Sequence, residues 1–190
     1  MADTTTKCLL SLALAFFCLA SQANPLSPAQ QVTVRVFACA DVATARAYVL
    51  AGDSGSLLDW LNGAVGYVVW RTRVTNDELG DAMAGGDLIG LSSLNMQRLQ
   101  VLSAYSGGEQ NMARADRRAA FDGVFSGAGG AITRASMAIV WKRIANRAEQ
   151  ALSSGLGTTI SPSLTTYEGT VPENSVGSML YTGSGVLIGC

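Results

Sequence analysis

The chain has 190 residues and a mass of 19.7 kDa, enough for one domain of ordinary size with a hydrophobic core. Apolar residues make up 48% and charged residues 14%, which excludes a charge-rich disordered chain. The net charge is −1, so no overall basic excess indicates a nucleic-acid-binding protein. The sequence contains no histidine, and this excludes a Ser-His-Asp triad, a Cys-His dyad and any histidine-ligated metal.

Residues 1–23 have the three-part pattern of a secretory signal. Lys7 supplies a weak positive start, residues 9–20 form an apolar run of 12 residues, and residues 21–23 place small side chains at the −3 and −1 positions. The apolar run is too short to span a bilayer comfortably as a helix. Two other interpretations stay open: a buried or disordered N-terminal helix, and non-native sequence from a start codon assigned too early.

The four cysteines do not form a recognisable framework. Cys8, Cys18, Cys39 and Cys190 include no C-x-x-C pair, which gives a zinc or redox site little support. A Cys39–Cys190 disulfide is compatible with the sequence, but no spacing favours it. Unpaired thiols are therefore the expectation.

Residues 24–40 contain two prolines followed by alternating apolar and polar residues. Val32, Val34 and Val36 would share one face, with the polar residues on the other. This alternation predicts a short strand, or a linker with one strand-like patch.

Residues 41–154 are expected to form a helical domain of short helices joined by glycine-rich turns. A β-branched and aromatic run predicts one extended segment over 67–74. Thr75 and Glu78 match a capping box that begins a helix. The expected helices cover residues 41–51, 57–62, 75–84, 92–105, 112–125 and 133–153.

The helix expected over 133–153 has the clearest apolar period. The residues that recur at helical spacing are Met137, Val140, Trp141, Ile144, Ala148 and Ala151. Residues 155–190 lack such a period and contain β-prone residues separated by glycine and proline. The prediction is a mainly α protein: a small helical bundle with an extended, partly β C-terminal arm, preceded by a signal-like or surplus extension over 1–40.

No motif indicates catalysis or cofactor binding. The glycine-rich stretch 127–130 lacks both the Lys-Ser/Thr pair and the preceding strand of a phosphate-binding loop. Asp77 and Glu78 are explained by a helix N-terminus, where the helix dipole favours anions. We therefore expect no enzyme activity, no cofactor, no metal and no small-molecule substrate.

Charge is distributed unevenly along the chain. Residues 41–87 hold seven acids and three bases, a net charge of −4, whereas residues 114–147 hold seven bases and two acids, a net charge of +5. Residues 150–190 add −2. One interpretation is ordinary solvated helix faces; the other is complementary contact between subunits or with a polyanion.

Several segments together resemble a family of small tailed-phage proteins encoded among virion structural genes. Residues 69–78 (VWRTRVTNDE) resemble its V-W-R-T-x-V-x-x-D-E stretch, and residues 119–127 resemble its R-x-G-I-D-x-x-W-x-G element. Residues 141–152 are similar to its C-K-R-x-A-T-x-A-E-K-L helix, and residues 155–171 match its G-T-G…P…E-G tail. The resemblance covers residues 41–180, with Phe125 in place of Trp and Trp141 in place of Cys.

The resemblance implies a virion component near the head–tail junction: a connector, adaptor or completion protein that forms a homo-oligomeric ring, binds the portal or another virion protein, and is assembled in the host cytoplasm. Under this hypothesis the arm, with Tyr167, Glu168, Gly169 and Val171, would grip a neighbour by strand addition. The basic residues that would contact an interface or packaged DNA in the lumen are Arg114, Arg117, Arg118, Arg134 and Arg147.

Two alternatives remain. The first is an exported envelope protein from which residues 1–23 are removed and in which Cys39 and Cys190 are oxidised. The second is a capsid cement or tail-tube-associated subunit.

Overall fold

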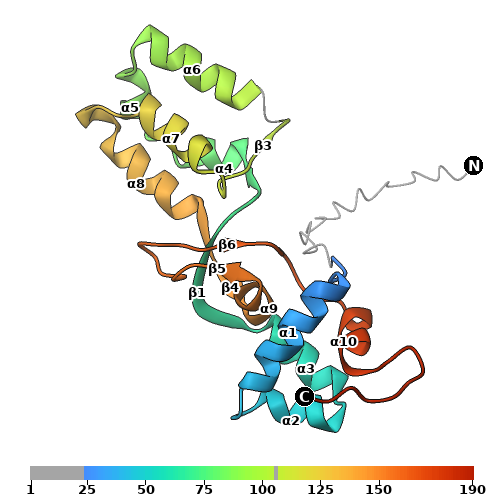
Figure 1. Ribbon diagram of the computed structural model, residues 1–190. Coiled ribbons are helices and arrows are strands. Elements are labelled where there is room, and N and C mark those ends of the chain that lie inside the picture. Colours follow the sequence, from blue (N-terminus) through green and yellow to red (C-terminus); the bar gives the residue numbers. More distant parts are fainter. Residues whose placement is uncertain (1–23, 105–106) are drawn as a thin grey trace, which may run out of the picture.

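The computed structural model describes residues 24–104 and 107–190 and is mainly α-helical, as expected (Figure 1). The signal-like segment 1–23, which includes Cys8 and Cys18, lies outside the described residues. The helices are α1 (Pro28–Ala40), α2 (Ala45–Ala51), α3 (Ser54–Asn62), α4 (Asn76–Asp81), α5 (Gly85–Ile89), α6 (Ser93–Ala104), α7 (Ala115–Val124), the 3-10 turn η1 (Ala128–Gly130), α8 (Ala131–Val140), α9 (Arg147–Ala151) and α10 (Glu173–Leu180).

The strands form short antiparallel pairs. β1 (Ala64–Trp70) pairs with β4 (Lys142–Asn146) in a register that places Val69 opposite Arg143. β2 (Val74–Thr75) pairs with β3 (Glu109–Gln110), and β5 (Ser153–Ser154) pairs with β6 (Leu164–Thr165).

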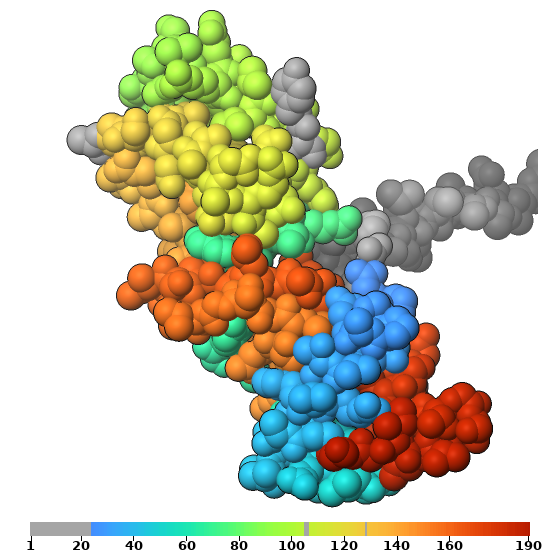
Figure 2. Space-filling model, in the orientation of Figure 1, coloured from blue at the N-terminus to red at the C-terminus, as the bar shows by residue number. Residues whose placement is uncertain are grey.

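The buried apolar residues form two clusters, and a lobe is built around each (Figures 1 and 2). The lower lobe combines both ends of the described chain: its core runs from Leu26 to Leu61 and again from Ala148 to Leu180. The upper lobe is continuous in sequence, with a core that runs from Val74 to Trp141. β1 carries the chain from α3 toward the upper lobe and β4 returns it, so this strand pair connects the two lobes.

Helix α1 shows that the strand or linker predicted over 24–40 is wrong. Ser27 and Gln30 form a capping box, in which Ser27 Oγ accepts from the Gln30 amide and the Gln30 side chain accepts from the Ser27 amide. Pro28 fits the first turn, where its missing N–H has no partner to lose. Val34 and Ala38, four residues apart, are buried, while Val32 and Val36 are exposed. The capping box and the burial of Val34 and Ala38 therefore favour a helix more strongly than the alternation of apolar and polar residues favours a strand.

The single helix predicted over 133–153 is also wrong, because the chain changes to strand after Val140. The Trp141 carbonyl accepts from the Arg71 amide at 2.9 Å, so the backbone leaves the helix to pair with β1. Another capping box then begins α9: Asn146 Oδ1 accepts from the Glu149 amide at 2.8 Å, and Glu149 Oε2 accepts from the Asn146 amide at 3.0 Å. This N-x-x-E signal lies inside the apolar period and was the evidence against one continuous helix.

The small-bundle and free-arm parts of the fold prediction are not confirmed, because residues 155–190 pack against the rest of the chain. Ser163 bonds to β1 in both directions, to the Val68 carbonyl and from the Trp70 amide. Tyr167 and Val171 are buried in the lower core, and α10 packs against α1 and α3. The backbone groups of Ser163, Thr166 and Gly169, in the arm that was expected to pair with a neighbour, thus bond within the chain. One core includes residues on both sides of residue 40.

A disulfide joins Cys39, at the end of α1, to Cys190, which corrects the expectation that these thiols are unpaired. The two cysteines are 151 residues apart in sequence, and their Cα atoms are 5.7 Å apart, a normal separation for a disulfide. The tail also folds back through hydrogen bonds: Tyr181 Oη donates to the Gly52 carbonyl at 2.9 Å, and the Ile188 amide donates to the Leu180 carbonyl. The disulfide and these hydrogen bonds thus hold the C-terminal tail against α1, α2 and α10 in the lower lobe.

Replacing both cysteines, Cys39→Ser with Cys190→Ser, should lower the free energy of unfolding by about 2–4 kcal/mol, because the cross-link restricts a long loop of the unfolded chain. Urea unfolding of the oxidised protein and of the variant measures the difference. A dithiol reductant should destabilise the wild-type protein to the level of the variant and leave the variant unchanged. Equal urea-unfolding midpoints for the oxidised protein and the variant would show that the disulfide does not stabilise the lower lobe.

Candidate assembly surface

The five arginines singled out by the sequence do not form one basic patch, and four of them make internal contacts. Arg118 lies over the Trp70 ring, 3.8 Å from its centroid, and donates to the Met112 and Ala113 carbonyls. Partial burial lowers the pKa of Arg118, and the charge of Asp122 opposes that shift.

The remaining arginines are dispersed over both lobes. Arg134 donates to the Phe125 carbonyl at 2.8 Å, and Arg147, in the lower lobe, donates to the Trp60 carbonyl at 3.0 Å. Arg114 pairs with Asp116 on the surface. Arg117 is partly exposed on α7. This arrangement gives little support to a common DNA-contacting surface.

The arm residues instead take part in an ion-pair cluster at the junction of β4 and α9, which we call the Glu149 clasp (Arg143, Asn146, Glu149, Glu168 and Gly169). Arg143 binds Glu149 with two hydrogen bonds of 2.6 and 2.7 Å, and its Nε donates to Glu168 at 3.1 Å. The Gly169 amide donates to Glu149 Oε1 at 2.7 Å, while Asn146 Nδ2 donates to the Gly169 carbonyl at 2.7 Å. The clasp thus ties the loop before α10 to β4.

The burial of Glu149 explains why its carboxylate oxygens are both paired. Glu149 is 1% exposed, and a buried carboxylate is tolerated only when its oxygens are paired. Burial disfavours the charged guanidinium, but Glu149 and Glu168 outweigh burial and raise the pKa of Arg143 above its ordinary value. Because each charged group already has partners inside the protein, the clasp is structural.

A second ion-pair cluster lies where β1 meets the upper lobe. Arg71 Nη2 is 2.8 Å from a Glu78 carboxylate oxygen, and Arg71 Nη1 donates to the Val140 carbonyl. Burial disfavours the carboxylate, but the Thr75 amide and the Arg71 guanidinium outweigh burial and lower the pKa of Glu78. Arg71, Thr75 and Glu78 all belong to the V-W-R-T…D-E stretch, so this motif forms the base of the upper lobe.

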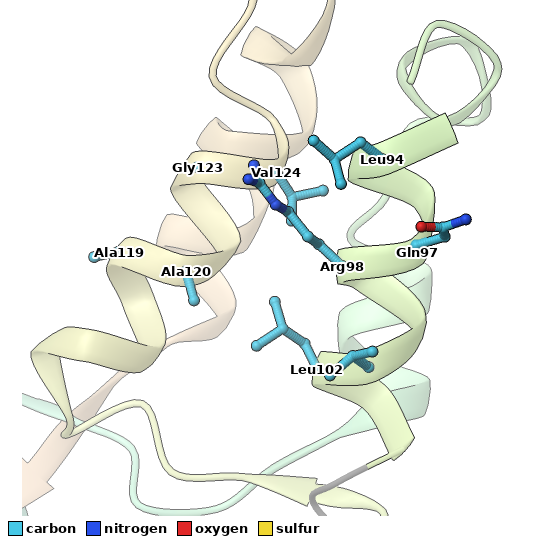
Figure 3. Close-up of a pocket in the computed structure, with 9 residues that line it drawn as sticks. Leu94, Gln97, Arg98, Leu102, Ala119, Ala120, Gly123 and Val124 are labelled. Atoms are coloured by element: carbon cyan, nitrogen blue, oxygen red, sulfur yellow. The ribbon is translucent and has the colours of Figure 1, made fainter. Parts of the chain in front are cut away.

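An apolar groove lies between α6 and α7, as shown in Figure 3. It has a volume of about 540 Å³ and is lined by α6 from Leu94 to Leu102 and by α7 from Ala119 to Val124. Leu94 and Val101 are 56% and 54% exposed. Figure 3 shows Arg98 extending from α6 toward the Gly123 end of α7. We call this hollow the α6–α7 groove.

Gly123 keeps the groove open. It lies within α7, where glycine costs about 1 kcal/mol relative to alanine. A Cβ added at this position would meet no heavy atom within 4 Å, so packing inside the subunit does not require glycine there.

Another exposed apolar surface of the upper lobe is the outer α8 face (Ala131, Ile132, Ala135 and Ile139). Ile132 and Ile139 are 65% and 74% exposed, while Thr133 and Met137 bury the opposite side of the helix. Arg134 is the single charged residue of α8, and its side chain bonds to the Phe125 carbonyl. A helix that is apolar on both sides is typical of one that is covered on both sides.

Neither surface was expected from the sequence. In the helix expected over 92–105, Leu99 is buried whereas Leu94 is exposed. The available signal was that α6 and α8 carry apolar residues on both sides, which one buried face does not require.

A scan against protein-family models, a search of curated proteins and a search of solved structures each found no match for this chain. Within residues 24–104 and 107–190, no helix is long and apolar enough to cross a membrane. The same residues contain no group of three or more Cys, Asp or Glu side chains placed to hold a metal ion.

Glu149→Gln should lower the free energy of unfolding by about 3–5 kcal/mol, because it leaves Arg143 without its main partner in a partly buried site. Chemical unfolding followed by circular dichroism measures the loss. Asp116→Asn, which breaks the exposed pair with Arg114, is the matched control and should change stability little. Equal effects of the two substitutions would show that the clasp does not hold the lobe together.

Alkaline pH should destabilise the protein through Tyr167. Burial, reinforced by the charge of Glu149, raises the pKa of Tyr167 to about 12, and the phenol donates to the Asn24 and Thr170 carbonyls. The neutral phenol is therefore favoured in the folded state, so its contribution is complete below the ordinary tyrosine pKa of about 10 and is lost as pH rises toward 12.

The measurement is the free energy of unfolding of the wild-type protein and of Tyr167→Phe between pH 8 and a pH of about 12. The difference between the two proteins should shrink across this range. A difference in unfolding free energy that stays constant over this pH range would show that ionisation of Tyr167 is not linked to folding.

Proposed function

We propose that this protein is a structural subunit of a tailed-phage virion, a head–tail connector or completion protein that assembles as a ring. The observation that carries the proposal is the pair of exposed apolar surfaces on the upper lobe, the α6–α7 groove and the outer α8 face. Large exposed apolar surfaces mark sites of protein contact. The ordered set of motifs over residues 69–171 supports the same class of protein.

The two lobes suit this role. The lower lobe is closed by the Glu149 clasp and the disulfide, so it supplies a rigid base. The upper lobe projects from that base, as Figure 2 shows, and carries both apolar surfaces. The portal or a neighbouring virion protein would bind the base, and copies of this chain would bind the upper lobe.

A second candidate function is that of an exported envelope protein, and the Cys39–Cys190 disulfide favours it. Disulfides persist in oxidising compartments, and residues 1–23 have the pattern of a removable signal. Cleavage after residue 23 would retain Asn24, whose carbonyl accepts from Tyr167.

The purified full chain should sediment as a closed oligomer of one size, because apolar surfaces of two kinds on each copy promote continued association until a ring closes. Analytical ultracentrifugation over a range of concentrations measures this. A protein that remains monomeric throughout would contradict the ring.

The intact mass of native material separates the two candidates. A chain recovered from phage particles supports the virion function, and a chain that begins at Asn24 and is recovered from the cell envelope supports export.

A further inference from the structure

We propose that successive copies join head to tail, with the outer α8 face of one copy seated in the α6–α7 groove of the next. This inference rests on the proposed function, because it names the contact by which the ring would form. The occupant of the groove is thus a second copy of this chain.

The exposed apolar residues of the two helices have the same spacing along the helix axis. Leu94 and Val101 on α6 are seven residues apart, and so are Ile132 and Ile139 on α8. Seven residues span about 10 Å along a helix, so the two exposed pairs have the same spacing. Recognition of a helix by a groove depends on such anchors, two turns apart on one face. Ala135, between the two isoleucines, lets the α8 backbone approach the groove closely.

The charges beside the two surfaces are complementary. Arg98 crosses the groove and bonds to the Asn95 side-chain oxygen, and no acid pairs with it in the part of the chain that the structure describes. Helix α4, which packs beside α8, carries the exposed Asp77 and Asp81, and neither has an ion-pair partner within the described ranges. The proposed contact would bring these carboxylates toward Arg98 of the next copy. Opposite charges at a rim favour one partner and one orientation.

The contact must be made between copies. Helix α8 packs on α4, α5 and η1, whereas the groove is formed where α6 packs on α7 (Figure 1). The two surfaces are therefore different patches of one lobe, and their contact is heterologous. Heterologous contacts produce a ring when the rotation closes.

Two variants disable one surface each. Ile139→Lys places a charge on the outer α8 face, near the helix C-terminus, where a cation is compatible with the helix dipole. Gly123→Leu fills the groove, and the open space around its Cβ and the better helix propensity of leucine preserve the fold. Ile160→Lys, at an exposed loop position between β5 and β6, is the matched control.

Each disabled variant should weaken self-association by about 30-fold or more and sediment as a monomer, while Ile160→Lys assembles like the wild-type protein. The decisive step is mixing. Equimolar Ile139→Lys and Gly123→Leu should form 1:1 dimers, because the mixture retains one intact groove and one intact α8 face. These dimers cannot grow further. Circular dichroism checks that each variant is folded.

The outcomes separate this inference from the proposed function. If the wild-type chain forms rings but the two variants also do so, or if their mixture stays monomeric, the interface is wrong and the ring remains. If Gly123→Leu dimerises by itself while Ile139→Lys does not, α8 pairs with α8 of a second copy and the head-to-tail contact is overturned. If the wild-type chain never associates, both the ring and this interface are overturned.

Discussion

Glu149 is a carboxylate buried almost completely, and much of the lower lobe is arranged to keep it paired. Its oxygens accept from the Arg143 guanidinium, from the Asn146 amide and from the Gly169 amide. A charge in this position is stabilised only when all three segments are in place, since removing one partner leaves an uncompensated charge. The clasp therefore couples the strand that returns from the upper lobe to the loop that leads into α10.

The two lobes differ in the contacts that stabilise them and in the surfaces that they expose. The lower lobe pairs the charged groups of the Glu149 clasp internally, packs its core between α1, α3 and α10, and is closed by the disulfide, although Val32, Val36 and Val42 stay exposed on it. The upper lobe has its own core but leaves Leu94, Val101, Ile132 and Ile139 exposed. We assign assembly among copies to the upper lobe because its exposed residues line a groove and an apolar helix face.

Local sequence signals predicted much of the helical structure. The Thr75–Glu78 capping box begins α4, Gly52 ends α2 in the left-handed conformation, and the extended run after α3 is β1. The corresponding box at Asn146 was overlooked because the apolar period runs through it. The candidate surfaces were not predicted, since a sequence does not state which apolar side of α6 or α8 is covered.

The sequence alone determined the helical class, the capped starts of several helices and the absence of histidine chemistry, because these depend on residue identity and short-range spacing. The tertiary structure alone decided that residues 155–190 pack against α1, that Cys39 meets Cys190, and that Arg143 binds Glu149 and Glu168. Some of these contacts join segments that are far apart in the chain. The others depend on the change from helix to strand within the range 133–153, where the sequence predicted one helix. Their free energy comes from burial and charge pairing that exist only after the lobes have formed.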